Sequence, residues 1–131
     1  MGQLVEVFTP LHKKTSRKYI DRMIDDKVHC MLKAKEYEEE YWDGDRRYGY
    51  GGYKYDGRWE PIAKNLIEKY NLTSESKILD VGCGKAYLLY ELSKLLPGIE
   101  LHGFDISNHG IKDAPKEIQK SLSIRKAQDV P

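Results

Sequence analysis

Apolar positions in the first part of the chain recur at helical spacing. Between residues 18 and 41 they fall at intervals of three and four, and neither Gly nor Pro interrupts them. The side chains of this stripe are Ile20, Met23, Ile24, Val28, Met31 and Leu32. We therefore expect one amphipathic helix over 18–41. A second helix is expected over 58–70, with Pro61 in its first turn, where the missing N–H does no harm.

From residue 76 onward the pattern changes to short apolar runs that alternate with amphipathic stretches. In chain order, we expect a strand at 77–81, a helix at 85–96, a strand at 99–106, a helix at 113–122 and a strand at 123–128. This alternation is typical of a parallel sheet with right-handed crossovers. The predicted fold class is α/β, a Rossmann-like parallel sheet of about three strands preceded by two N-terminal helices.

The segment 41–57 is rich in tyrosine and glycine, with five of each in seventeen residues. Glycine at this density excludes a regular helix or strand, so we expect an irregular loop. As an acceptor site or lid, it offers flat apolar rings, hydroxyl donors and glycine hinges. The candidate residues for that role are Tyr48, Tyr50, Tyr53 and Tyr55. The alternative is a loop whose tyrosines pack the N-terminal helices onto the sheet.

Charge and composition narrow the range of partners. Lys and Arg number 22 against 21 Asp and Glu, for a net charge of +1, whereas proteins that bind nucleic acids by bulk electrostatics carry a strong basic excess. The apolar runs are far shorter than the roughly 18 residues that span a membrane. Cys30 and Cys83, like the four histidines, lack metal-ligand spacing. We expect a cytoplasmic protein with reduced thiols, no metal and no membrane or nucleic-acid partner.

A pair of glycines follows the first expected strand. Gly82 and Gly84 allow a tight turn and a close approach to a ligand, and the following helix offers free N–H groups, as in nucleotide-type cofactor sites. The third glycine of the dinucleotide fingerprint would fall at position 87, where Tyr87 crowds a pyrophosphate. Asp80 would repel a phosphate and attract a cation. Asp105, at the end of the second strand, is placed to accept ribose hydroxyls.

These residues resemble the cofactor half of the class I S-adenosylmethionine-dependent methyltransferases. The family's first motif, apolar-apolar-acidic-apolar-Gly-x-Gly-x-Gly, matches residues 78–86 with Ala86 in place of the third glycine. The resemblance implies S-adenosylmethionine as cofactor. It implies that Asp80 and the Gly82-Cys83-Gly84 backbone hold the methionine end of the cofactor. It further implies that Asp105, with Ile106 beside it, holds the ribose, and that Asp129 and the backbone amide of Val130 contact the adenine.

The same resemblance implies methyl transfer by in-line displacement, in which the protein mainly positions the acceptor and excludes water. No residue is assigned as a catalytic acid or base. We expect a small-molecule acceptor, with a sugar or sugar nucleotide as one candidate. The basic side chains that would suit an anionic acceptor are Arg46, Arg47, Lys54 and Arg58.

The motifs occupy residues 76–131, while the family's sheet continues beyond its third strand. We therefore expect residues 1–75 to be a helical extension with the Tyr/Gly loop, and 76–131 to be the cofactor half of a longer enzyme. A non-catalytic cofactor-binding fragment or assembly subunit is the alternative, and an NAD-dependent oxidoreductase is disfavoured by Tyr87. In the family's strand order the first strand is central, so 77–81 would be an exposed edge, through which we expect self-association.

Overall fold

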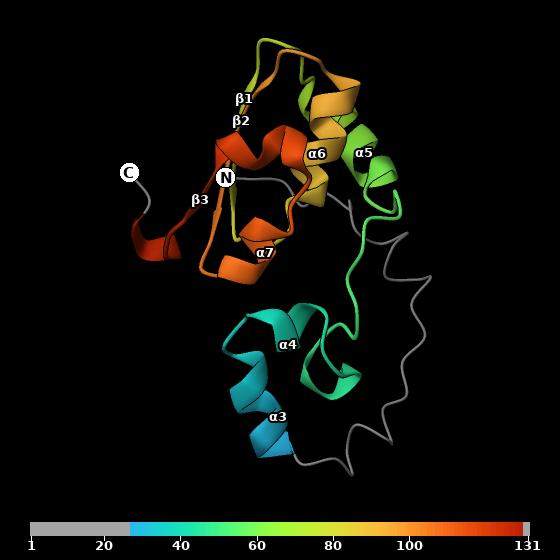
Figure 1. Cartoon of the computed structure of the whole chain (residues 1–131). Helices are drawn as coiled ribbons and strands as arrows, with labels where there is room; N and C mark the ends of the chain where they lie inside the picture. The colour runs from blue at the N-terminus through green and yellow to red at the C-terminus, as the bar shows by residue number, and fades with distance from the viewer. Residues whose placement is uncertain (1–26, 130–131) are drawn as a thin grey trace.

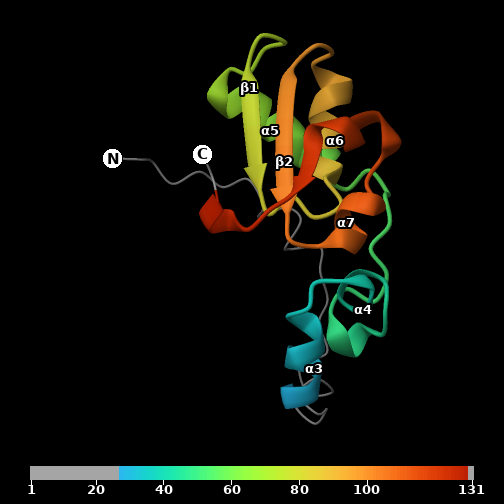
Figure 2. The ribbon, with the colours of Figure 1, turned by 60° about the vertical axis from the view of Figure 1, so that its left-hand side comes forward.

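The computed structural model describes residues 27–129 of the 131-residue chain. These residues form a sheet with packed helices and, beyond one end of the sheet, a helical N-terminal portion that contains α3 (Lys27–Ala34) and α4 (Glu39–Trp42) (Figure 1). The arrowheads of β1 (Lys77–Val81) and β2 (Glu100–Asp105) point toward that portion (Figure 2). The N-terminal portion therefore lies at the carboxyl ends of the strands.

The sheet is parallel throughout, in the order β1-β2-β3, with β3 at Leu122–Ile124. Ile78 pairs with Leu101, and Gly103 with Leu122. The predicted α/β fold class, a partial Rossmann-like sheet, is confirmed. In the described part of the chain β1 is an edge strand, as expected from the sequence.

Two helices cover one face of the sheet, α5 (Glu60–Tyr70) and α6 (Tyr87–Leu95) (Figure 2). Pro61 lies in the first turn of α5, as predicted. The core between helices and sheet consists of Ala63, Ala86, Leu89, Leu92, Ile99, Leu101, Ala114 and Ile118. None of the described helices has the length and apolar character needed to cross a membrane.

The single helix predicted over 18–41 is wrong within the described residues, and its first part, 18–26, lies outside them. The helix breaks between α3 and α4, where Tyr37 adopts a left-handed backbone with φ 51°. The predicted apolar stripe is not the buried face, since Val28, Met31 and Leu32 are exposed and Cys30 is buried. At this break the Tyr37 ring packs edge-on against the Tyr41 ring, with their centroids 5.0 Å apart.

The last third also departs from the prediction. The helix predicted over 113–122 is a shorter 3₁₀ helix, η2 (Lys116–Ser121), and a short helix that was not predicted, α7 (Asn108–Lys112), precedes it. Pro115, with ψ 134°, is extended and separates them. The strand predicted over 123–128 is shorter, because the chain leaves the sheet after β3 and forms the 3₁₀ helix η3 (Ala127–Asp129). Asp129 therefore does not end a strand.

Candidate functional site

The turn between β1 and α6 depends on its glycines. Gly82 and Gly84 have φ values of 77° and 59°, which is the left-handed region that glycine enters without strain. The N–H groups of Gly82 and Cys83 both donate to the carbonyl oxygen of Phe104, at 2.8 and 3.0 Å. Ala86 is also left-handed, with φ 61°, so the position of the family's third glycine keeps a glycine-like conformation. The turn is thus fixed to the end of β2.

Asp105 is braced by this turn. One of its carboxylate oxygens accepts a hydrogen bond from the Gly84 N–H at 2.8 Å, and the other accepts from the Ser107 N–H at 2.8 Å. A carboxylate has about four lone-pair sites, so each oxygen can still accept a hydrogen bond from a ligand. Asp105 is therefore oriented before any ligand arrives.

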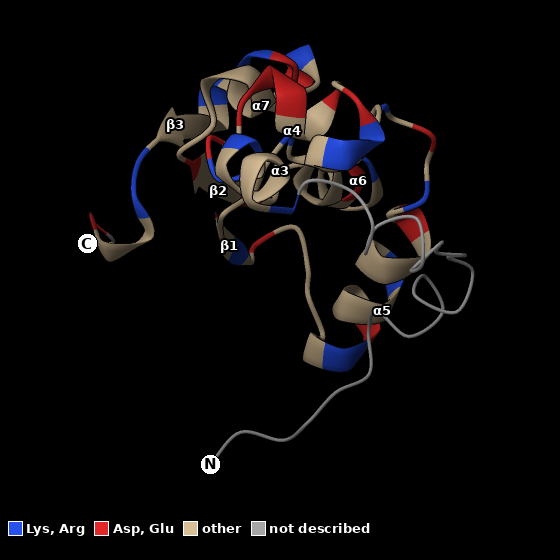
Figure 3. Cartoon of the chain, turned by 90° about the horizontal axis from the view of Figure 1, so that it is seen from below, with Lys and Arg blue, Asp and Glu red and all other residues tan. Residues whose placement is uncertain are grey.

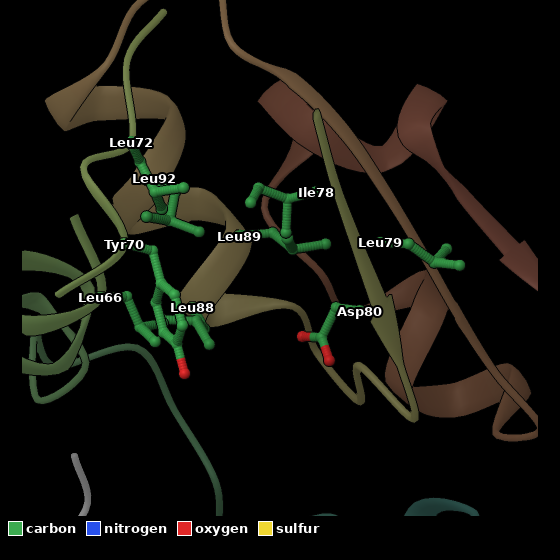
Figure 4. A pocket seen from close by; sticks show the side chains of 9 residues that line it. All are labelled: Leu66, Tyr70, Leu72, Ile78, Leu79, Asp80, Leu88, Leu89 and Leu92. Carbon is green, nitrogen blue, oxygen red and sulfur yellow. The ribbon is translucent and has the colours of Figure 1, made fainter. Parts of the chain in front are cut away.

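Asp80 is the contrasting carboxylate. It is half-buried in β1, and among residues 27–129 it makes no hydrogen bond or ion pair. Together with leucine side chains, it lines an apolar groove beside β1 (Figure 4). Burial raises the pKa of Asp80 above its ordinary value, and the neighbouring Asp105 carboxylate raises it further. A cation at this point would relieve both effects.

Cys83 has no features of a nucleophile. Burial, with the charges of Asp80 and Asp105, raises the pKa of its thiol to about 12, so the reactive thiolate is disfavoured at neutral pH. Among residues 27–129, neither Cys30 nor Cys83 forms a disulfide.

Two cavities meet at Gly82. The smaller, of about 260 Å³, lies between the residues 82–86 turn and aromatic rings, and Asp80 lines it. The larger, of about 410 Å³, lies over the end of β2, where Asp105 and Ile106 line it. The structure thus brings together six of the predicted cofactor residues, which are Asp80, Gly82, Cys83, Gly84, Asp105 and Ile106.

The remaining two predicted cofactor residues are placed differently. Asp129 is exposed at the end of η3 and lines neither cavity, whereas Ala127 and Arg125 of the same segment line the larger one. Val130 lies outside the described residues.

Trp42, which the sequence did not single out, lies against the turn. A Cβ atom on Gly84 would come within 2.6 Å of its ring. The indole N–H of Trp42 donates to the Ser107 hydroxyl at 3.0 Å, and the ring stacks on Tyr50 with a centroid distance of 5.3 Å and an interplanar angle of 2°. Both rings line both cavities. A Trp within the Tyr/Gly-rich segment 41–57 was the available signal.

The four candidate tyrosines separate into two groups. Tyr50 and Tyr53 line the smaller cavity, and Tyr53 is buried against Trp42 and Tyr87. Tyr55 lines neither cavity, because its hydroxyl bonds the Glu91 carboxylate and accepts from Lys94. Tyr48 packs instead against His29 and Arg47. The segment therefore packs the N-terminal portion onto the domain and also contributes two rings to the cavities.

Lys85 joins the N-terminal portion to the turn. Its fully buried ammonium group lies 2.7 Å from Asp43 and 2.8 Å from Asp113, and it also donates to the Tyr53 carbonyl. His109 Nε2 contacts the Asp43 carboxylate at 2.5 Å. Burial alone would raise the pKa of Asp43, but hydrogen bonds from Lys85, His109 and the Tyr53 N–H hold it well below its usual range.

Asp43, His109 and Asp113 also bring three potential metal-ligand atoms within 4.8 Å of one another. However, the Lys85 ammonium lies between the two carboxylates, where it supplies the positive charge that a metal ion would otherwise bring. This group is best described as an ion-pair network that fixes α4 to the turn.

The basic residues of the aromatic segment line neither cavity, although the Arg58 guanidinium lies 5.7 Å from the ring centroid of Tyr53, which lines the smaller one. Arg58 forms a two-pronged pair with Asp56, with its shortest contact at 2.8 Å, and Arg46 donates to the Gly49 carbonyl. Arg46, Arg47, Lys54 and Arg58 are all absent from the lining of the two cavities that meet at Gly82. Basic and acidic segments are interspersed at this end of the molecule (Figure 3).

Residues 72–127 match a family model described as a methyltransferase domain. The matched region runs from the residues before β1 to the start of η3, and it contains the turn together with Asp80 and Asp105. The N-terminal portion, with Trp42 and Tyr50, lies outside it. No curated protein matches the chain.

Proposed function

We propose that this chain, whose residues 72–127 are a class I S-adenosylmethionine-dependent methyltransferase domain, binds S-adenosylmethionine at the carboxyl ends of β1 and β2 for methyl transfer to a small molecule. The observation that carries the proposal is the pair of carboxylates beside the glycine turn. Asp105 is held by two backbone N–H groups with acceptor sites to spare, and Asp80 has no cation of its own among the described residues.

The residues present fit the cofactor. The free lone pairs of Asp105 suit the two ribose hydroxyls, and the Asp80 carboxylate suits the ammonium group of the methionine end. The larger cavity, about 410 Å³, is within the size range of small-molecule sites, roughly 300–1,000 Å³. Ile106 and Ala127 give it apolar lining for the adenine. We also propose, from the family resemblance, that Asp129 and Val130 complete the adenine site.

S-adenosylmethionine supplies a methyl group on a positively charged sulfur, so the protein needs only to position the acceptor and exclude water. Trp42 and Tyr50 border both cavities and can exclude water from the space around Gly82. Lys85 cannot act as a free base, because its ammonium group is committed to Asp43 and Asp113.

For the acceptor, the aromatic walls of the smaller cavity favour a molecule with a flat apolar face, such as a sugar ring. A nucleotide part has less support, because the four basic side chains of the aromatic segment lie outside both cavities.

Calorimetric titration of the full chain with S-adenosylmethionine, S-adenosylhomocysteine and NAD tests the cofactor. We expect the adenosyl compounds to bind and NAD not to bind. Asp105→Ala should weaken adenosyl binding at least about tenfold, because two charge-assisted hydrogen bonds to the ribose are lost. Glu68→Ala, which removes an exposed carboxylate from α5, is the matched control and should bind normally. Binding of NAD without either adenosyl compound would refute the proposal.

A non-catalytic, cofactor-binding assembly subunit is the second candidate, and the open edge of β1 favours it. Leu79 and Val81 are about half exposed there, as expected of a strand that another chain completes. The two candidates differ in turnover. Cofactor binding without methyl transfer to a sugar acceptor, followed by activity once a partner chain is added, would favour the subunit.

A further inference from the structure

The lysines and arginines of the described chain differ in whether they have a carboxylate partner. Those that contact a carboxylate all precede β2, and they are Lys33, Lys54, Arg58, Lys64, Lys77, Lys85 and Lys94. The five cations that follow β2 form no ion pair or cation–π contact with another residue of 27–129. We call these five the basic strip, which consists of Lys112, Lys116, Lys120, Arg125 and Lys126.

The local structure turns the basic strip toward solvent. All five of its side chains are exposed. Ile118 is buried in the core, so η2 presents the lysines on either side of it to solvent. The Gln119 amide donates to the Lys112 carbonyl at 3.0 Å and holds η2 against the end of α7. Basic segments lie on both sides of β3 in Figure 3, so the basic strip follows this edge of the described sheet.

Few negative charges oppose the basic strip. Residues 112–126 contain five basic side chains against two acidic ones, Asp113 and Glu117, which gives a local net charge of +3. The Asp113 carboxylate is already paired with the Lys85 ammonium at 2.8 Å. The net charge of +1, from which we expected no nucleic-acid partner, averages over this local excess. A concentrated excess of positive charge attracts a polyanion even when the whole chain is almost neutral.

The surroundings of the basic strip narrow the kind of polyanion. Ile124 is the one large apolar side chain exposed within residues 112–126. The basic strip therefore offers little to insert into a membrane and no apolar centre for a protein interface. Lysine and arginine without carboxylate partners suit phosphate groups, whose neutralisation releases counterions. A line of cations along one edge suits a flexible single strand, which can follow it.

We propose that the basic strip binds the phosphodiester backbone of a single-stranded nucleic acid. Arg125 also lines the larger cavity, so a strand bound along the basic strip would pass the proposed cofactor site. The binding does not require the cofactor, so this inference goes beyond the proposed function and can fail without it. Each phosphate neutralised on a single strand contributes about −0.7 to the slope of log K against log salt concentration, so five contacts give a slope of about −3.5 at most.

Fluorescence anisotropy of the full chain with labelled oligouridylate and oligothymidylate, each of about 20 nucleotides, tests the proposal. We expect dissociation constants in the micromolar range at about 50 mM salt, and a steep loss of affinity as salt is raised. Equal binding of the two strands would mean that the backbone alone accounts for the affinity. Tighter binding of the RNA would mean that the 2′-hydroxyl contributes as well. Both outcomes support the proposal.

Paired variants locate the binding surface. Lys116→Gln/Lys120→Gln should lower the affinity about tenfold at low salt and reduce the slope by about 1.4, because two phosphate contacts are lost. Lys35→Gln/Lys69→Gln is the matched control, since it removes the same charge from exposed lysines outside the basic strip and should bind like the unchanged chain. All four lysines are exposed, so both variants should fold, which thermal melting checks.

Three outcomes would overturn the proposal. They are no binding of either oligonucleotide at about 50 mM salt, an equal loss of affinity in the two variants, and a slope close to zero. Binding to vesicles of phosphatidylserine and phosphatidylcholine without binding to either oligonucleotide would overturn it too, and would assign the basic strip to a membrane surface. If the oligonucleotides bind but S-adenosylmethionine does not, the proposed function fails while the basic strip stands.

Discussion

Replacing Lys85 with methionine should weaken the attachment of the N-terminal portion to the turn. The ammonium group donates to Asp43 at 2.7 and 2.9 Å, contacts Asp113 at 2.8 Å and also bonds the Tyr53 carbonyl. Methionine preserves most of the stem but leaves two carboxylates without their cation. Removal of one partner from a buried ion pair costs about 3–5 kcal/mol.

The structure favours the lower end of that range. The Asp113 side chain is 42% exposed and can be solvated, and Asp43 keeps its bonds from His109 and the Tyr53 N–H. We therefore expect a loss of about 3 kcal/mol in the free energy of unfolding. For a chain of this size, that corresponds to a Tm lowered by roughly 10 °C or more.

Urea unfolding followed by tryptophan fluorescence measures this loss, because Trp42 and Trp59 both lie in the aromatic cluster. Lys64→Met is the control, since it removes an exposed helix pair with Glu60 that is worth about 0.5 kcal/mol or less. The double variant Lys85→Met/Asp43→Asn should be less destabilised than Lys85→Met alone, because one unpaired carboxylate is gone. If Lys85→Met costs no more than Lys64→Met, the buried network does not exist in solution.

Three further outcomes follow from the same geometry. The pKa of Asp80 is raised in the folded chain, so its ionisation destabilises the fold as pH rises through that pKa. Asp80→Asn should therefore raise the ligand-free Tm at neutral pH and remove most of the Tm increase caused by S-adenosylmethionine. A lower ligand-free Tm would contradict this. Gly84→Ala should displace Trp42 and shift the tryptophan emission, because the new Cβ would lie 2.6 Å from that ring. Gly57 also has a positive φ, 78°, but nothing lies within 4 Å of its Cβ position, so Gly57→Ala should show only backbone strain. Equal effects of the two variants would refute the Trp42 contact. If the chain self-associates through β1, its sedimentation coefficient should depend on protein concentration. Val81→Lys should abolish that dependence, and the control Val28→Lys, at an exposed position on α3, should leave it unchanged. A monomer at all concentrations would contradict self-association.

The parts of the fold that the sequence predicted depend on local signals. β1 was predicted at its observed bounds, because an apolar run ends in a pair of glycines. α5 was predicted because apolar residues over 58–70 fall on one side of a helix, and Pro61 is compatible with its first turn. The convergence of Asp80 and Asp105 followed from a general property of parallel sheets, in which the carboxyl ends of neighbouring strands lie at one edge.

The parts that it missed depend on contacts between distant residues. Lys85 bonds Asp43 across 42 residues, and His109 bonds the same carboxylate across 66. Periodicity carries no information on such pairs, so the break at Tyr37 and the placement of Trp42 could not be found. The roles of Asp129 and Val130 stay predictions that rest on the resemblance alone.

The bond from Trp42 to Ser107 spans 65 residues, which has a consequence for the order in which the protein is made. During synthesis the N-terminal portion leaves the ribosome well before α7 and the turn against which it packs. Until then Trp42 and its neighbouring tyrosines have no surface to cover them, as is typical of folds with long-range contacts. A nascent chain arrested before residue 107 should therefore expose these rings, and it should aggregate or recruit a chaperone more readily than one arrested after η2.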